Sequence, residues 1–399
     1  MKKRGLLSYL VLGLTLACLA AVGFSALSNV GLAQEAPAAT NLSLEQKAYL
    51  AEAEHLRRTL GHAVWSGWDQ VDIPDIVYNQ EYAFVLGYPD PPAGWFKVPD
   101  GPRRGGAWQS VPEDLFEGAT YYRQRLPGEQ VTPEAFTVLV GDRWLASAPT
   151  RSWLQTSFRL QIADQLPPVI DRIVPYRIIV PLFTGNVDKY ISLVLHESFH
   201  AYQGMQAPER LAAAERATQA ASSYPWGQPD MASYWDRETE LLAQALESHD
   251  GDETRALVRQ FLAQRAQRRQ NFELQARFVD YERLREWLEG CAKFVELDIW
   301  KAAFIAPNYQ PLESIQMLPD FDNYDTFERA WSQEVAQLQR SAGQQSDTLF
   351  YYTGMAQAFL LERLYPDWQT RVMEDDVDLE TLLQEVIGDR AAFSRPALE

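Results

Sequence analysis

Cysteine is almost absent from this chain of 399 residues, which holds only Cys18 and Cys291. Because Cys18 falls in an N-terminal apolar segment, a chain that has lost this segment cannot form an intrachain disulfide, and the cysteine count identifies no compartment. Histidine is scarce as well, with five residues. Basic residues are in deficit, 36 against 54 acidic ones, for a formal net charge of −18. A chain this acidic repels phosphate backbones, so we exclude nucleic acid as its main partner.

The sequence also lacks the marks of a non-globular protein. Hydrophobic residues make up 46%, aromatic residues 12% and charged residues 23% of the chain, and no fixed-period repeat is present. This composition excludes intrinsic disorder, collagen and a coiled coil. The length corresponds to two or three folding units of ~150 residues each, so a large core can form.

Only the N-terminus carries a long hydrophobic run. Three basic residues open the chain, apolar residues dominate 6–27, and a small-x-small pattern ends at Ala33. We therefore predict a signal peptide over residues 1–33. The run exceeds the usual ~7–15 residues and could span a bilayer, so an uncleaved anchor formed by residues 5–27 is the alternative. Both interpretations place the body of the protein outside the cytoplasm, as a periplasmic or secreted protein or anchored to the membrane.

The remaining sequence divides into three parts. Residues 34–42 read as a tether, residues 43–175 as a mixed N-terminal region and residues 176–399 as a mainly helical region. Expected helices cover 44–61, capped by Ser43, then most of the chain from Asp188, including 205–288 and 354–364. Expected strands cover 76–86, 136–141, 144–146 and 176–182, the last at a sheet edge because it contains Pro181. Residues 87–106 hold five Pro and five Gly, which predicts an irregular loop that either lies on the surface or forms a lid.

The strongest functional signal is His196-Glu197-Ser198-Phe199-His200, which follows the apolar segment 191–195. On a helix, a spacing of four places both imidazoles on one face, where they can reach one ion at ~2.0–2.1 Å. Glu197 lies beside the first ligand and can accept a proton from a water that zinc makes more acidic. Two histidines and a glutamate in an apolar helix would be destabilising without a partner. We therefore predict one zinc ion, with His196 and His200 as ligands and Glu197 as the catalytic base.

Zinc hydrolases usually have three protein ligands and one position for water. The only later histidine, His249, lies in a polar turn and is a poor candidate. A glutamate is the better third ligand, and the candidates are Glu238, Glu240, Glu247, Glu282 and Glu289. The first three lie in a charged helical stretch, for which we expect a solvent-exposed face.

One segment resembles a known family of metallopeptidases. Trp287-Leu-Glu-Gly-Cys-Ala-Lys-Phe-Val-Glu296 is similar to the Trp-Leu-Asn-Glu-Gly-x-Ala-x-Tyr-x-Glu segment of gluzincins of the aminopeptidase N type. It is still closer to the Glu-Gly-x-Ala-x-Tyr helix of the bacterial peptidase MA-like proteins. The resemblance implies that Glu289 is the third zinc ligand. Glu296 would lie two turns further on the same helix face and could orient a ligand histidine.

A second segment adds to this resemblance. Residues 350–354, Phe-Tyr-Tyr-Thr-Gly, precede an apolar helical stretch and resemble the Tyr-x-x-Gly helix start of the aminopeptidase N group. The resemblance assigns to Tyr351 the phenol that stabilises the negative charge of the tetrahedral intermediate.

The sequence also departs from these families. Leu288 replaces the usual Asn, Phe294 replaces the Tyr, and 88 residues separate His200 from Glu289. The Gly-Ala-Met-Glu-Asn motif that holds a substrate amino terminus is absent. The resemblance covers roughly residues 176–366 and supports zinc-dependent hydrolysis without implying aminopeptidase specificity.

The sequence thus predicts an α+β, zincin-like fold. It would have a strand-containing N-terminal part, an active-site helix with the His-Glu-x-x-His motif, and a mainly helical C-terminal part. The predicted function is that of an extracytoplasmic zinc metallopeptidase acting on peptides or proteins. The alternatives are a non-catalytic zinc-containing envelope protein with a peptide-binding groove, and a zinc hydrolase of non-peptide amides. The oligomeric state is left open.

Overall fold

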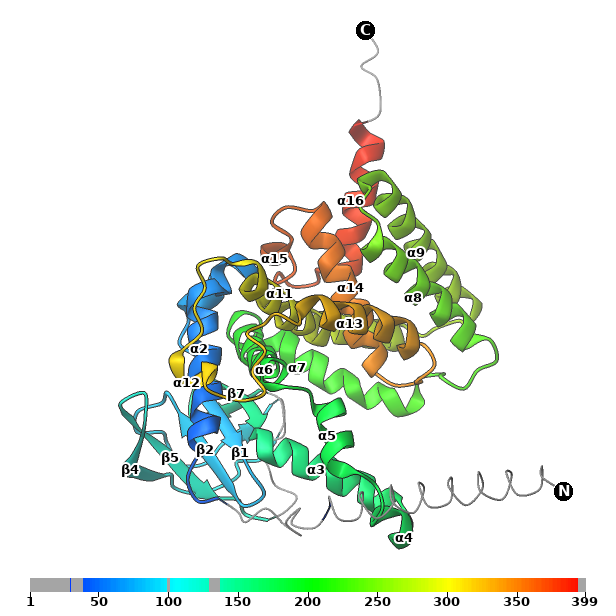
Figure 1. The fold of residues 1–399 in the computed structure, drawn as a ribbon. Helices are drawn as coiled ribbons and strands as arrows, with labels where there is room; N and C mark the ends of the chain where they lie inside the picture. The colour runs from blue at the N-terminus through cyan, green and yellow to red at the C-terminus, as the bar shows by residue number, and fades with distance from the viewer. Residues whose placement is uncertain (1–28, 30–38, 99–100, 129–136, 394–399) are drawn as a thin grey trace, which may run out of the picture.

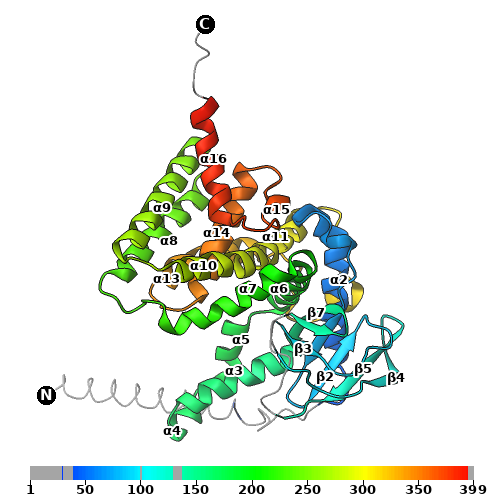
Figure 2. The same ribbon diagram turned by 180° about the vertical axis from the view of Figure 1, so that it is seen from behind.

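The computed structural model has an α+β fold (Figure 1). It describes residue 29 and residues 39–98, 101–128 and 137–393. The predicted signal peptide and most of the tether lie outside the described residues. A sheet forms one end of the molecule and most of the helices from α7 onward form the other, whereas α12 lies beside α2 at the sheet end (Figures 1 and 2).

The sheet and its flanking elements come from the N-terminal half of the chain. They are α2 (Leu44–Val64), η1 (Trp68–Gln70), β1 (Asp75–Tyr78), β2 (Tyr82–Leu86), β3 (Phe96–Lys97), β4 (Gln109–Phe116), β5 (Ala119–Arg125), β6 (Val138–Val140), β7 (Arg143–Pro149), α3 (Arg151–Gln165), α4 (Pro168–Asp171) and α5 (Tyr176–Thr184).

The C-terminal half of the described chain is helical. It contains α6 (Val187–Gln206), α7 (Pro208–Ala217), η2 (Thr218–Ser223), α8 (Met231–Glu247), α9 (Gly251–Asn271), α10 (Ala276–Arg285), η3 (Glu286–Gly290), α11 (Cys291–Ile305), α12 (Glu313–Gln316), α13 (Phe327–Ser341), α14 (Thr348–Leu364), α15 (Trp368–Arg371) and α16 (Leu379–Phe393). The predicted strand-containing N-terminal part and mainly helical C-terminal part are confirmed.

The seven-stranded sheet has the order β3-β6-β7-β1-β2-β5-β4. β1 and β7 are parallel, and the other neighbours are antiparallel. Both faces of the central strands are buried. Val77 and Phe84 pack into the core shared with the helices, whereas Ile76 and Val85 pack into a smaller core on the opposite face.

Residues 76–86 form a hairpin rather than one continuous strand. β1 and β2 pair antiparallel, and the turn between them is closed by Asn79, whose Oδ1 accepts hydrogen bonds from the backbone N–H groups of Glu81 and Tyr82 at 2.9 and 2.8 Å. Such a side-chain turn lets the chain reverse within three residues. Both halves are apolar because both sheet faces are covered.

The predicted helix at 44–61 is confirmed. Ser43 caps it, its hydroxyl accepting a hydrogen bond from the backbone N–H of Gln46, and α2 continues three residues further, to Val64. The predicted strand and turn near 136–146 correspond to β6 and β7. The predicted irregular segment 87–106 contains the short strand β3, and none of its described residues lines the cavity of the candidate site.

The prediction of a strand over 176–182 is wrong. These residues form helix α5, and their buried members, Tyr176 and Val180, are four apart, which is the spacing of a helix face. The β-branched residues that suggested a strand are overridden by tertiary packing, since α5 packs on α3 with the rings of Phe158 and Phe183 5.3 Å apart. Pro181 therefore lies inside a helix and not on a sheet edge.

Among the described residues, no single helix is long and apolar enough to cross a membrane; only α5 and α6 taken together, with a 44° bend between them, reach that length and apolarity.

A cluster of buried charges joins the C-terminal helices. Arg265 and Arg268 of α9 are fully buried and contact Glu238 of α8, Glu282 of α10 and Glu286 of η3. Arg265 holds Glu286 through two hydrogen bonds, of 2.8 and 2.6 Å. We refer to these five residues as the buried charge cluster. Burial alone would raise the pKa of Glu282, but Arg268 and the neighbouring Arg269 lower it well below its usual value.

The exposed face expected for Glu238, Glu240 and Glu247 is confirmed for the last two only. Glu240 and Glu247 are exposed, whereas Glu238 is buried and paired with both arginines of the buried charge cluster. A buried carboxylate is tolerated there because cations on the next helix compensate it.

Candidate metal centre

Helix α6 supplies two of the candidate ligands. Asn186 caps this helix, its side chain accepting a hydrogen bond from the backbone N–H of Lys189. The helix packs between strand β7 and helix α11. His196 and His200 lie one turn apart on it and are both buried. The predicted helical placement of the motif is therefore confirmed.

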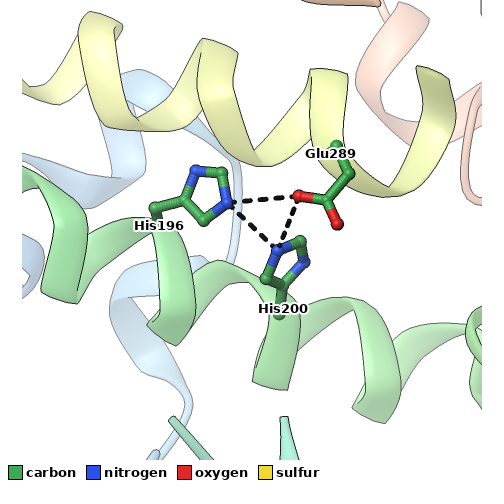
Figure 3. A group of neighbouring side chains, drawn as sticks. All are labelled: His196, His200 and Glu289. Atoms are coloured by element: carbon green, nitrogen blue, oxygen red, sulfur yellow. Dashed lines mark hydrogen bonds and ion pairs between the residues drawn. The ribbon is translucent and has the colours of Figure 1, made fainter. Parts of the chain in front are cut away.

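Glu289 approaches the two histidines from the helical segment that faces α6 (Figure 3). Its Oε2 lies 3.5 Å from Nε2 of His196 and 3.4 Å from Nε2 of His200, and the two imidazole nitrogens are 3.1 Å apart. The three residues form the one group of His, Cys, Asp and Glu side chains in the described part of the chain that could hold a metal ion. The structure thus brings together the three residues that the sequence designated as ligands.

The spacing of these atoms fits a metal ion. Ligand atoms at ~2.0–2.1 Å from a tetrahedral zinc ion are separated from one another by about 3.3 Å. The three observed separations, 3.1, 3.4 and 3.5 Å, cluster around this value. Two imidazole nitrogens and one carboxylate oxygen are also a donor set that zinc prefers.

Glu289 lies on η3, a π-helical turn between α10 and α11. Single π turns inside helices are rare and frequently occur at functional sites. Next to it, Gly290 touches Gly354 of α14: a Cβ on Gly290 would lie 2.5 Å from the carbonyl carbon of Gly354, and a Cβ on Gly354 would lie 2.8 Å from the Cα of Gly290. The backbones of η3 and α14 therefore meet without side chains between them, which fixes the turn that carries Glu289 against α14.

We expect Gly290→Ala to lower the free energy of unfolding by about 3 kcal/mol, the upper end for overpacking, because backbone on both sides prevents relaxation. Urea unfolding measures this effect. The control is Gly388→Ala, an exposed position within α16 with open space around it, where alanine should stabilise the helix by about 0.5–1 kcal/mol. Equal stability of the two variants would contradict the close contact.

Gln203, one turn after His200, orients that histidine and was not identified from the sequence. Its Nε2 donates hydrogen bonds to the carbonyl oxygens of Trp287 and Leu288, both at 3.1 Å, so its Oε1 is the acceptor that faces Nδ1 of His200 at 2.8 Å. The Nδ1 of His200 therefore carries the proton, and Nε2 is left to bind a metal. The same amide ties α6 to the turn that carries Glu289.

Glu296 occupies the position expected of a residue that orients a ligand. Its Oε2 lies 3.2 Å from Nδ1 of His196, and its Oε1 accepts a hydrogen bond of 2.7 Å from Lys293. Burial alone would raise the pKa of Glu296, but Lys293 and His196 lower it to about 2. A carboxylate that is ionised here favours the proton on Nδ1 of His196 and frees Nε2.

The site has a high density of negative charge. Burial alone would raise the pKa of Glu289, but Arg285, which donates a hydrogen bond of 2.7 Å to Oε1, and His200 lower it well below its usual value. Burial disfavours the charged form of His196, yet Glu289 and Glu296 outweigh burial and raise its pKa to about 10 without a metal. The carboxylates that raise the pKa of His196 also provide negative charge for a divalent cation at the same place.

Glu197 faces an open cavity beside these ligands. The cavity has a volume of about 460 Å³ and is lined by His196, Glu197, His200, Glu289 and the residues around them. The Oε2 of Glu197 is buried and makes no hydrogen bond in the described part of the structure. Burial raises the pKa of this carboxyl to about 7. Glu197 thus lies next to the candidate ligands, and its Oε2 is not engaged in a hydrogen bond with the described residues.

Tyr351 and Tyr352 both line the cavity, and both lie inside α14, which begins at Thr348 and not at Gly354 as the sequence suggested. The ring of Tyr351 is parallel to the imidazole of His196, with 6.4 Å between the ring centres. Burial and the Glu289 carboxylate raise the pKa of Tyr351 well above its usual value, so its hydroxyl keeps its proton and can donate. Burial and Glu334 raise the pKa of Tyr352, which lies on the side of Glu334 and Lys293.

The other candidate ligands lie elsewhere. Glu238 and Glu282 belong to the buried charge cluster, and His249 is exposed in the turn after α8. Cys291 is buried in the main core, and burial raises the pKa of its thiol to about 12.

No protein-family model, no curated protein and no solved structure matches this chain. The case for its function therefore rests on the geometry of the site.

Proposed function

We propose that this protein is a zinc-dependent metallopeptidase with a zincin-like fold, in agreement with the resemblance of its sequence to gluzincins. The observation that carries the proposal is the near-tetrahedral spacing of His196, His200 and Glu289 beside the unpartnered carboxylate of Glu197. The N-terminal apolar segment supports action outside the cytoplasm, as a periplasmic, secreted or membrane-anchored enzyme.

In the proposed mechanism, His196, His200 and Glu289 would hold one zinc ion, which would supply a Lewis acid for polarising a carbonyl group and acidifying water. Glu197 accepts the proton of the attacking water at its free carboxylate oxygen and then delivers it to the nitrogen of the leaving amine. The hydroxyl of Tyr351 donates a hydrogen bond to the oxygen on which negative charge develops. Gln203 and Glu296 keep the two imidazoles in the tautomer that leaves Nε2 for the metal.

The proposed peptidase is preferred over a non-catalytic zinc protein because of Glu197. In a purely structural zinc site a buried carboxylate oxygen with no partner costs free energy and provides nothing. An open cavity of about 460 Å³ next to the ligands also agrees with a metal that keeps one position for water, whereas structural sites are closed. A zinc hydrolase of non-peptide amides would use the same residues and differs only in the substrate.

Removal and return of the metal tests this proposal. The purified chain is expected to cleave casein or a random peptide library, to lose activity when a chelator removes one zinc ion per chain, and to regain it when zinc is added back. His200→Ala should have no activity as purified, after chelation or after zinc is added back. One firmly bound zinc ion with no cleavage of any peptide would favour the non-catalytic alternative, and cleavage that survives complete removal of metal would refute the proposal.

A further inference from the structure

Two hollows meet along helix α6. The cavity of the candidate metal centre and a second one, of about 280 Å³, share Lys189 and Glu296 as lining residues. The second hollow continues away from the metal centre between α6 and α13, where Asn186 and Gln333 line it. Together they form a groove that is longer than the immediate surroundings of one peptide bond.

Lys189 lies at the junction of the two hollows and is half-buried. No carboxylate in the described part of the structure pairs with its ammonium group. Its neighbour Lys293 differs, because Lys293 is held by Glu296 at 2.7 Å and Glu334 at 3.3 Å. Of the two lysines that line the metal cavity, one thus has its charge compensated and the other does not.

The carboxylates near Lys189 are already engaged. Asp322 accepts a hydrogen bond from Asn186, and Asp188 accepts two from backbone N–H groups. Asp320 pairs with Arg151, and the two oxygens of Glu296 face Nδ1 of His196 and the ammonium of Lys293. Lys189 lines both hollows and its ammonium has no counter-ion among the described residues, so an anion from outside the chain would be favoured at this point.

Gly185 leaves room for the stem of Lys189. This glycine has φ +76°, and a Cβ there would lie 2.9 Å from Cβ and 2.5 Å from Cδ of Lys189. The absence of a side chain at residue 185 is thus what allows the lysine to lie along the groove.

Lys189 also lies in line with the metal ligands. Seven residues, or nearly two helical turns, separate it from His196, which places the two on one face of α6 about 10 Å apart along the axis. An extended peptide covers about 10 Å with three residues. The wall of the metal cavity on the side of α3 and α5 is apolar and includes Leu154, Phe158 and Phe183.

We infer that Lys189 binds a carboxylate of the substrate, about three residues from the bond that is cleaved, so that the preferred substrates are extended acidic peptides with a bulky apolar residue at the metal centre. This inference rests on the proposed peptidase function for the position of the scissile bond, and on the groove alone for the recognition of an anion.

The test uses terminally blocked alanine peptides that contain one Phe and one Glu. The Glu lies one to five residues from the Phe, on either side of it. For each of these peptides there is a matched peptide with Gln in place of Glu. Binding is measured by fluorescence anisotropy on the zinc-loaded Glu197→Gln protein, in which the peptides stay intact. We expect Glu about three residues from Phe to bind about 10-fold more tightly than Gln, the usual effect of a hydrogen-bonded charge pair. Lys189→Met, which keeps the stem, should abolish this preference, and Lys189→Glu should reverse it.

Arg177→Glu is the matched control, since it makes the same change of charge on an exposed face of α5 that lines neither hollow; it should leave the preference unchanged. Equal binding of Glu and Gln peptides at every position, a preference that survives in Lys189→Met, or no binding by any peptide would overturn the inference. Selective binding without cleavage by the zinc-loaded wild type would refute the peptidase and leave the anion site standing.

Discussion

Glu197→Gln should leave one zinc ion bound per chain and lower kcat/KM for peptide cleavage by a factor of about 10² to 10⁴, the range expected when a general base is removed. Gln has nearly the shape of Glu but cannot accept the proton of the attacking water. Because Glu197 makes no hydrogen bond through Oε2 and is not one of the three candidate ligands, the substitution breaks no structural contact of that oxygen. The loss should therefore appear in kcat rather than in stability or metal content.

Steady-state kinetics, zinc analysis and thermal unfolding on the same preparation distinguish these effects. Glu209→Gln, the same change on the exposed surface of α7, is the control and should behave as wild type. Wild-type activity of Glu197→Gln would remove Glu197 from the mechanism. A loss of zinc in this variant would mean that Glu197 builds the metal site instead of acting as the base.

Arg265→Met is expected to lower the free energy of unfolding by about 3–5 kcal/mol, because it leaves buried carboxylates without their cation. Arg265 is fully buried and binds Glu286 through both ends of its guanidinium group and Glu238 through Nε. Glu286 is the first residue of the π turn that carries Glu289, and Thr353 of α14 also donates a hydrogen bond to it. The substitution should therefore weaken zinc binding as well.

Urea unfolding measures this effect against Arg237→Met. Arg237 pairs with Glu240 at 2.6 Å, as close as Arg265 is to Glu286, but both partners are largely exposed, so its loss should cost less than about 1 kcal/mol. Adding Glu286→Gln to Arg265→Met should recover part of the stability, because it removes one of the stranded charges. If the two arginine variants were equally stable, burial would not be the reason that the cluster contributes to the free energy of unfolding.

The sequence could single out the candidate metal ligands because their chemistry is local or carried by a motif. The spacing of His196 and His200 requires only a helix, and α6 provides it. Glu289 could be selected among five glutamates only through a family resemblance, since 88 residues of chain separate it from His200. The contact between η3 and α6 that makes it a candidate ligand is tertiary.

The residues that hold the candidate ligands in place were harder to predict. Gln203, Arg285 and Lys293 lie three or four residues from a site residue on their own helices, where polar pairs occur on many solvent-exposed helix faces. Only the packing of α6 against α11 and its hydrogen bonds to η3 turn those pairs inward. For the same reason the charged stretch around Glu238 was expected to be exposed. In the structure Glu238 is buried, because its ion-pair partners lie on α9.

The errors in secondary structure have a common cause. In α5 the β-branched run of residues 178–180 outweighed the four-residue spacing of Tyr176 and Val180, which was the helical signal. In α14 Gly354 was interpreted as the start of a helix, whereas its role is to admit the backbone of Gly290. Both errors arose because the predictions relied on local residue preferences at positions where packing between helices determines the structure.

The claim on which this account depends is that one zinc ion is bound jointly by His196, His200 and Glu289. X-ray absorption at the zinc edge of the purified protein measures it most directly. We expect one zinc ion per chain with two imidazole nitrogens and oxygen ligands at about 2.0–2.2 Å, and loss of one imidazole from the spectrum in His200→Gln. A chain that binds no zinc, or whose zinc spectrum is unchanged in that variant, would contradict the account.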